Sequence, residues 1–242
     1  MPNAPQLDVI FLDIDDTLFA TTDFVSGARR GALQAMIDRG LNADIEYLLN
    51  ELESVVEEFG SNHDRHYEFL LKRLPDELTC NINPELMVVA GVIAYHNAKW
   101  QHLHIGDKEL QLLSDIHDKG VRLGVISSGL VRKQTEKILR LGIDRFIDHK
   151  LIFITHGVGM AKSNVQLYQS ALAATGCSAA RVMHVGDHPF HDVDSANEAG
   201  MKTVWVNSGG KHSVNDPKSK PDHVIANFAA LRKVLSDDYS IS

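Results

Sequence analysis

The sequence has little cysteine, and its cysteines do not show a metal-binding spacing. Cys80 and Cys177 lie far apart in the chain, and neither belongs to a CxxC pattern. This excludes a disulfide framework and a metal site of the CxxC type. We therefore expect two buried free thiols in a protein of a reducing compartment.

An excess of basic residues is also missing. The chain has 24 Lys and Arg against 32 Asp and Glu, a net charge of −8, which argues against a nucleic acid polymer or a membrane surface as partner. The longest nearly unbroken apolar run, Leu86–Tyr95, is about half of the ~20 residues that span a bilayer. No basic segment precedes the first apolar run, so no secretory signal is visible. We expect a cytoplasmic protein without a membrane partner.

Short apolar runs alternate with segments of helical spacing. Near-continuous apolar runs are expected for strands that are covered on both faces, and they occur at Leu7–Leu12, Val121–Ile126, Leu151–Ile154, Val182–Val185 and Thr203–Val206. Helical spacing is found at Lys108–Lys119, Val131–Leu141, Val165–Thr175 and Val193–Ala199. This alternation predicts an α/β fold, with a Rossmann-like core of parallel strands and helices on both faces.

One long segment interrupts the alternation. Between Phe19 and Ile105 only helical patterns occur, at Ala28–Asp38, Ala43–Glu58, Asp64–Leu74 and Pro84–Trp100. We therefore predict a core of residues 1–18 and 106–242 and an all-helical domain of residues 19–105. After the last strand we expect a polar loop at Asn207–Pro221, a closing helix at Phe228–Leu235 and a frayed end, SDDYSIS.

The first predicted strand ends in a cluster of acids, Asp13, Asp15 and Asp16. Such carboxylates repel one another unless a cation or a turn accommodates them. Alternate residues of an extended segment face the same way, so Asp13 and Asp15 address one bound group. Oxygen ligands of this kind suit Mg²⁺, which also favours phosphate as a ligand. The alternative is an Asp-rich turn.

Two further segments carry groups suited to phosphate. Ser127 and Ser128 end the second strand and precede a helix, whose free N–H groups and adjacent hydroxyls bind anions; a plain serine N-cap is the alternative. Lys162 follows a glycine-containing loop at the same predicted edge of the sheet. A site with several carboxylates and a phosphate dianion needs a fixed cation of this kind, although a single lysine is most often exposed.

Asp187 and Asp192 follow the strand at Val182–Val185. Asp187 comes at the strand end and can reach the cation that Asp13 binds, while Asp192 is suited to a supporting contact or a helix cap. His188 and His191 are candidates for a transition metal, but carboxylates outnumber imidazoles here, so we interpret them as surface or supporting residues.

These segments resemble the motifs of the haloacid dehalogenase-like (HAD) hydrolases, over nearly the whole chain. FLDIDDTLF resembles the family's nucleophile motif, GVISSG its second motif, Lys162 its third, and VGDHPFHDVDSANEAGM its fourth. The helical segment lies where the phosphatase branch inserts a cap between the first two motifs. The chain departs from the family in having Ser163 where a proline is frequent, and Asp16 where a glycine is frequent.

The resemblance implies a role for each matching residue. Asp13 would attack phosphorus, and Asp15 would protonate the leaving alcohol and then activate water. Asp13, Asp187 and Asp15, the last through its main-chain carbonyl, would hold Mg²⁺. Asp192 would orient Lys162 or a metal-bound water, and the phosphate would be bound by Thr17, Ser127, Ser128 and Lys162.

We therefore predict an Mg²⁺-dependent phosphatase that hydrolyses a small phosphorylated metabolite through an aspartyl-phosphate, as a monomer or homodimer. Asp15 argues against a dehalogenase, because dehalogenases of this family lack the second aspartate of the first motif. Two alternatives stay open: a phosphomutase of the same superfamily, and a non-catalytic protein that binds a phosphorylated ligand.

Overall fold

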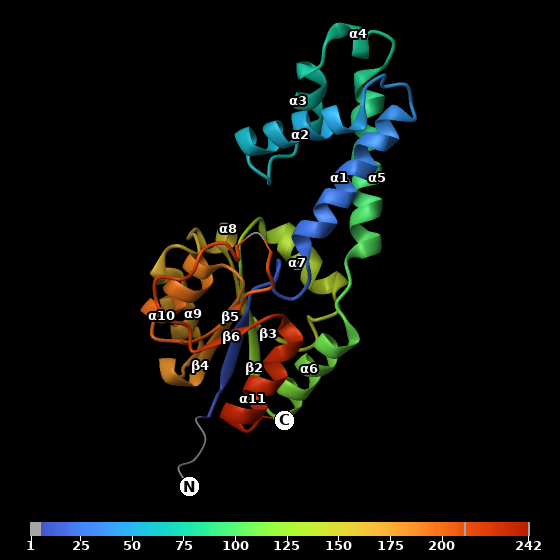
Figure 1. Ribbon diagram of the computed structural model, residues 1–242. Coiled ribbons are helices and arrows are strands. Elements are labelled where there is room, and N and C mark those ends of the chain that lie inside the picture. Colours follow the sequence, from blue (N-terminus) through green and yellow to red (C-terminus); the bar gives the residue numbers. More distant parts are fainter. Residues whose placement is uncertain (1–5, 211, 242) are drawn as a thin grey trace. The chain divides into compact units, whose positions relative to one another are not determined.

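A parallel six-stranded sheet forms the centre of one unit of the protein. A computed structural model describes residues 6–210 and 212–241. The strand order is β3-β2-β1-β4-β5-β6 (Figure 1), with bounds Val9–Leu12 (β1), Arg122–Ser127 (β2), Ile147–Ile154 (β3), Val182–Gly186 (β4), Lys202–Val206 (β5) and His223–Ile225 (β6). Every neighbouring pair is parallel, so all strands end at one edge of the sheet.

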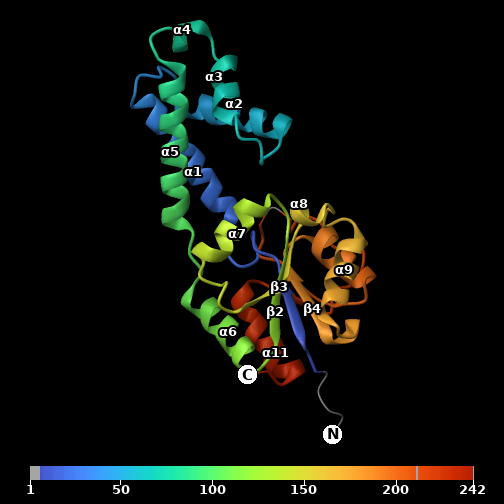
Figure 2. The ribbon, with the colours of Figure 1, turned by 180° about the vertical axis from the view of Figure 1, so that it is seen from behind.

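Helices cover both faces of this sheet, which explains why its strands are apolar throughout. β1 and β4 are buried along their whole length. Val9 and Phe11 pack in one cluster with Leu167 and Ala171 of α9 (Val165–Thr175), whereas α6 (Asp107–Asp118) contacts β2. Figures 1 and 2 show α9 and α10 on one side of the sheet and α6 and α11 on the other. The predicted α/β fold class is confirmed.

Short helical segments follow several strands of this unit. They are α7 (Val131–Arg140), α8 (Thr155–Val158), α10 (Ser195–Glu198) and α11 (Leu231–Tyr239), with 3₁₀ turns η1 (Ala179–Arg181) and η3 (Phe228–Ala230) and a π-helical segment η2 (Pro189–Asp194). The unit comprises the chain up to Ala20 and from His104 onward.

A second compact unit, Thr21–Leu103, is all-helical. It contains α1 (Thr21–Ile37), α2 (Ile45–Phe59), α3 (His66–Arg73), α4 (Asp76–Thr79) and α5 (Pro84–His102). Asp44 caps α2 by accepting hydrogen bonds from the N–H groups of Glu46 and Tyr47. A separate apolar core holds this unit together, with members such as Leu33, Leu48, Leu52, Leu70 and Met87. The unit therefore buries its own hydrophobic surface.

Several predictions of local structure were wrong. The helix predicted at Val193–Ala199 is present, but it begins earlier, at Pro189, and its first part is the π-helical η2, which continues directly into α10. The end of the chain is not frayed from Ser236, because α11 continues to Tyr239, whose side chain is buried. The cysteines are not both buried, since Cys80 is exposed and Cys177 is partly exposed.

Four short elements were missed: α4, α8, η1 and β6. Each has only three or four residues, too few to show a hydrophobic period. Among the described helices, none combines the length and apolar character needed to cross a bilayer.

Candidate active site

The sheet topology brings three of the predicted site residues to one edge. β1 lies between β2 and β4, and Asp13 follows β1 directly, with its N–H donating to the Val185 carbonyl at 2.9 Å. Ser127 is the last residue of β2, and Asp187 follows the last residue of β4. Asp13, Ser127 and Asp187 therefore meet at the carboxyl ends of three adjacent strands, where ligands bind in open parallel sheets.

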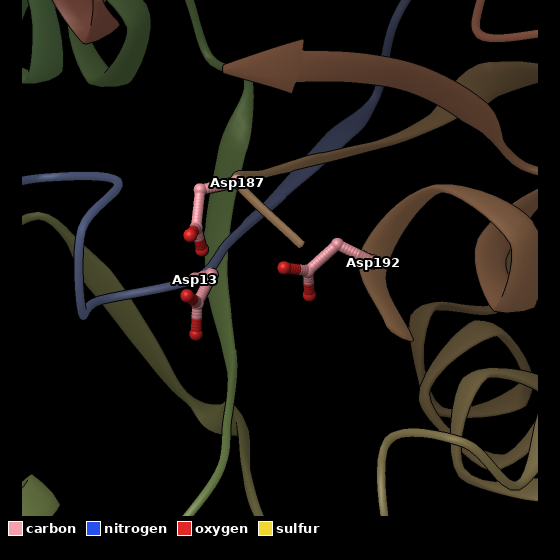
Figure 3. A group of neighbouring side chains, drawn as sticks. All are labelled: Asp13, Asp187 and Asp192. Atoms are coloured by element: carbon pink, nitrogen blue, oxygen red, sulfur yellow. The ribbon is translucent and has the colours of Figure 1, made fainter. Parts of the chain in front are cut away.

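Asp13, Asp187 and Asp192 form a tight cluster of carboxylates (Figure 3). One oxygen of each lies within 4.8 Å of the others. Their exposed fractions are only 5%, 9% and 1%. The cluster therefore places three acids in a space that water barely reaches, which is unfavourable unless cations compensate the charge.

Lys162 supplies one of those cations. Its Nζ lies 2.6 Å from Asp13 Oδ1 and 2.7 Å from Asp192 Oδ1, and the residue is 5% exposed. Burial by itself would lower the pKa of this ammonium, but the charges of Asp13 and Asp192 outweigh burial and raise the pKa. Lys162 is therefore a permanent cation that joins two of the three acids.

One lysine does not neutralise the cluster. Burial raises the pKa of Asp13 to about 7, although Lys162 opposes the shift. Burial, with the nearby charge of Asp13, raises the pKa of Asp187 to about 8. Asp192 differs: burial would raise its pKa, but Lys162 and a hydrogen bond from His184 lower it. Without a further cation, Asp13 and Asp187 thus resist ionisation near neutral pH.

The donor set fits a hard divalent cation. Asp13 and Asp187 supply carboxylate oxygens, which Mg²⁺ prefers. Among the described residues, none donates a hydrogen bond to the Asp187 carboxylate, whose lone pairs are thus available to an ion. The Asp192 carboxylate already accepts hydrogen bonds from protein donors, so it is better suited to hold Lys162 in place than to coordinate the cation.

Four groups surround the Asp192 carboxylate. Oδ1 lies 2.7 Å from Lys162, 3.0 Å from His184 Nε2 and 3.3 Å from the Tyr168 hydroxyl, and Oδ2 accepts from the His188 N–H at 3.0 Å. His184 and Tyr168 were not predicted as site residues. His184 could have been found, because it is a polar residue in the otherwise apolar strand VMHVG.

Two buried hydroxyl groups at this edge have no partner. Among the described residues, Thr17 Oγ1 and Ser127 Oγ are buried without a hydrogen bond. Buried polar atoms are nearly always paired, so two unpaired hydroxyls at the edge that carries this cluster indicate a polar ligand. Ser128 differs, since it is exposed; its carbonyl accepts from Gln134 at 2.7 Å.

Asp15 has a cation of its own. Lys137 Nζ contacts both of its carboxylate oxygens, at 2.6 and 2.7 Å, and Gln134 Nε2 donates to Oδ2 at 3.0 Å. Both partners lie on α7 and were not predicted. A signal existed: Gln134 and Lys137 share a helical face with Ile138 and Leu141, where apolar residues are expected.

The next residue, Asp16, has a backbone φ of 57°. This is the left-handed region, where glycine is the usual residue and Asp is among the better tolerated alternatives. It is the position at which the sequence departs from the glycine that is frequent in the family.

The two predicted supporting histidines stack on each other. The rings of His188 and His191 lie 3.9 Å apart, and His212 lies 4.3 Å from His188. His188 Nδ1 accepts from the N–H groups of Phe190 and His191, which caps η2. Burial and the neighbouring imidazoles lower the pKa of His188 to about 4, so the ring is neutral. These contacts support η2, the segment that carries Asp192.

The fold and this site define the class of protein. Residues 9–206 match the model of the haloacid dehalogenase-like hydrolases, and the chain belongs to this family. The prediction of a hydrolase of the phosphatase type is confirmed by its relatives.

Among these relatives is the glyceraldehyde 3-phosphate phosphatase of Pyrococcus abyssi, which is 40% identical over 204 residues, 84% of this chain and 83% of the relative. The enzyme of the same name from Methanothermobacter thermautotrophicus is 37% identical over 95% of this chain and its own full length. A crystal structure of a 2-haloacid dehalogenase from Pseudomonas syringae superposes with a TM-score of 0.65 at 23% identity, covering 96% of this chain and 99% of its own. At that identity the likeness concerns the fold.

Proposed function

We propose that this phosphatase hydrolyses small phosphate monoesters, with glyceraldehyde 3-phosphate as the first substrate to test, through an aspartyl-phosphate on Asp13 and with Mg²⁺ as cofactor. The observation that carries the proposal is the cluster of Asp13, Asp187 and Asp192 around Lys162, next to the unpaired hydroxyls of Thr17 and Ser127. The substrate is suggested by the names of relatives that match most of the chain.

Asp13 is the proposed nucleophile. In the first step an Oδ atom of Asp13 forms a bond to phosphorus, the bond from phosphorus to the alcohol oxygen breaks, and Asp15 gives a proton to that oxygen. In the second step a water oxygen bonds to phosphorus, the bond to Asp13 breaks, and Asp15 takes a proton from the water. Both carboxyl groups return to their initial state, and phosphate leaves.

Mg²⁺ would be held by Asp13, Asp187 and the main-chain carbonyl of Asp15. When bound, it supplies positive charge that offsets the repulsion between a carboxylate nucleophile and a phosphate dianion. Lys162 contributes a second positive charge at a fixed position, and Asp192 keeps it there through the 2.7 Å contact. Preorganised charges of this kind are effective because they need not reorganise during the reaction.

The phosphoryl oxygens would be bound by the groups that lack a partner in the structure. The Ser127 hydroxyl at the end of β2 and the Thr17 hydroxyl in the loop after β1 are both buried. Each can donate one hydrogen bond to a phosphoryl oxygen. Ser128 is proposed to contribute its N–H rather than its exposed hydroxyl.

The test is release of inorganic phosphate from a panel of small phosphate esters in magnesium buffer. Asp13→Asn should abolish turnover and also the hydroxylamine-labile phosphate that acid-quenched wild-type protein carries. Asp16→Asn is the matched control, because it makes the same change in the same loop and asparagine tolerates φ near 57°. Turnover by the Asp13→Asn variant at the wild-type rate would refute the nucleophile.

The same panel separates the remaining alternatives. A phosphomutase would convert sugar phosphates into isomers without releasing phosphate. A non-catalytic binding protein would show a thermal shift with phosphate and Mg²⁺ but no turnover of any ester.

A further inference from the structure

A second buried lysine lies outside the four sequence motifs. Lys137 of α7 is 8% exposed, and its Nζ contacts both oxygens of Asp15, at 2.6 and 2.7 Å. Asp15 and Lys137 are 122 positions apart in the sequence, so only the folded core brings them together. An ammonium with both carboxylate oxygens within hydrogen-bond reach restricts the rotation of that carboxyl group.

Gln134 makes the second contact, one helical turn before Lys137. Its Nε2 lies 3.0 Å from Asp15 Oδ2 and 2.7 Å from the Ser128 carbonyl, and the residue is 4% exposed. One side chain thus joins the loop after β1 to the loop after β2. Helix α7 therefore holds the carboxylate of Asp15 through two donors and fixes the neighbouring loop through one of them.

Core packing does not account for these two residues. They share the buried face of α7 with Ile138, where an apolar side chain would fill the space without a desolvation cost. A buried ammonium is unfavourable unless it is paired, and removal of one partner leaves the other charge uncompensated. A lysine at position 137 is therefore favourable only because Asp15 pairs with it. This indicates a role in the active site rather than in core packing.

We propose that Lys137 and Gln134 are positioning residues for Asp15, which they hold in the orientation that proton transfer requires. The inference rests on the proposed function, in which Asp15 gives a proton to the leaving alcohol oxygen. Proton transfer needs a short and well-aligned contact, and a carboxyl group on a loop loses that alignment when its side chain rotates freely. Lys137 and Gln134 transfer no proton themselves.

The consequence is a dependence on the leaving group. An alkoxide needs a proton as it departs, so its ester depends on Asp15, whereas p-nitrophenolate departs without one. In Lys137→Met, the single-turnover rate of the first step with glyceraldehyde 3-phosphate should fall about 100-fold, within the range of general acid catalysis. With p-nitrophenyl phosphate the same rate, followed as release of p-nitrophenolate, should fall under about threefold, because this leaving group departs without the acid. The comparison is made on the first step because the second step, in which Asp15 takes a proton from water, is common to both esters. Lys137→Arg, which keeps a cation in reach of Asp15, should recover a large part of the loss.

Gln134→Leu provides an independent variant should Lys137→Met fail to fold. It preserves the side-chain volume and removes one donor to Asp15, so we expect a smaller loss with the same dependence on leaving group. Arg140→Gln is the control on the same helix, because Arg140 is exposed and contacts Glu136; both esters should be turned over at wild-type rates.

The outcomes separate this inference from the proposed function. If the wild type hydrolyses both esters, equal losses of the first-step rate in Lys137→Met, or no loss with either ester, would overturn the positioning role alone. Absence of hydrolysis of both esters by the wild type would overturn the proposed function and this inference with it.

Discussion

Replacement of Asp187 by asparagine should inactivate the enzyme and yet stabilise it when no metal is present. Asp187 is 9% exposed and lies in the cluster with Asp13 and Asp192. Asparagine has nearly the same shape but no charge. The substitution removes the charge repulsion, which should raise the stability of the metal-free protein. It also removes a proposed metal ligand, which should abolish activity.

The magnitude follows from the geometry. Two unit charges at 4.8 Å, the upper limit of separation in the cluster, repel by about 3 kcal/mol at an effective dielectric constant of about 20. Asp187 has two such neighbours, and the single charge of Lys162 offsets about one of them. We therefore expect the metal-free variant to be more stable than the wild type by about 3 kcal/mol at pH 8.

The pH dependence has a definite sign. The pKa of Asp187 in the folded chain is about 8, above the unshifted value of 3.8. At pH values between these two pKa values, the Asp187 carboxyl is protonated in the folded wild type and ionised in the unfolded chain. The free energy of unfolding of the wild type therefore falls as the pH rises through this window. The asparagine variant has no such proton, so its advantage should grow from pH 5 to pH 8.

The assay is urea unfolding in EDTA at pH 5 and pH 8, followed by the fluorescence of Trp205 in a Trp100→Phe background. Trp205 is buried in β5 and its Nε1 donates to the Asp187 carbonyl at 2.9 Å. Added Mg²⁺ should stabilise the wild type, by about 2.7 kcal/mol at a hundred times its Kd, and leave the variant unchanged.

Asp194→Asn is the matched control with the opposite sign. The Asp194 carboxylate accepts from Ser219 N and Oγ, both at 2.7 Å, and from Lys218 N at 3.1 Å. Loss of these charge-assisted contacts should cost about 1 kcal/mol. An Asp187→Asn variant that is less stable than the wild type in EDTA at pH 8 would refute the reasoning on repulsion.

Three further substitutions have defined outcomes. Lys162→Met should reduce turnover by at least about 100-fold and destabilise the core by about 3 kcal/mol in urea, because the buried carboxylates lose their shared cation; unchanged stability would contradict this. Gly186→Ala should lower turnover strongly in the phosphate-release assay, because a Cβ there would lie 2.3 Å from Asp192 Cγ and displace that carboxylate; wild-type rates would show that Asp192 need not be fixed. Gly124→Ala should destabilise the core by about 1–3 kcal/mol without changing kcat, because its Cβ would lie 2.5 Å from a ring carbon of Phe11; a loss under about 0.5 kcal/mol would show that the ring can move.

The strand ends of the core could be predicted from sequence because two independent signals coincide there. The first signal is the end of an apolar run, which predicts where a buried strand ends. The second is the polar residue that follows, which core packing does not require. Asp13, Ser127 and Asp187 satisfy both conditions, and the parallel order of β2, β1 and β4 brings them together. Their roles in catalysis stay predictions, which the substitutions above test.

The partners of these residues could not be predicted in the same way. Lys137 and His184 are single polar residues within an amphipathic helix and an apolar strand, and sequence spacing alone does not say which acid each one meets. Lys137 meets Asp15 across 122 positions only because α7 follows β2, the strand next to β1. Such contacts are properties of the topology, and no local pattern contains them.

The charge balance of the site explains why its residues depend on one another. When ionised, Asp13, Asp187 and Asp192 together carry three negative charges against the one positive charge of Lys162, whereas Asp15 contacts a separate cation, Lys137. The cluster is therefore two positive charges short of neutrality, the charge of a single divalent cation. Lys137 contacts Asp15 apart from this cluster, so Asp15 does not draw on the cations that the nucleophile needs. In the proposed first step Asp15 enters protonated, and it is the carboxylate formed in that step, the base of the second step, whose charge Lys137 compensates.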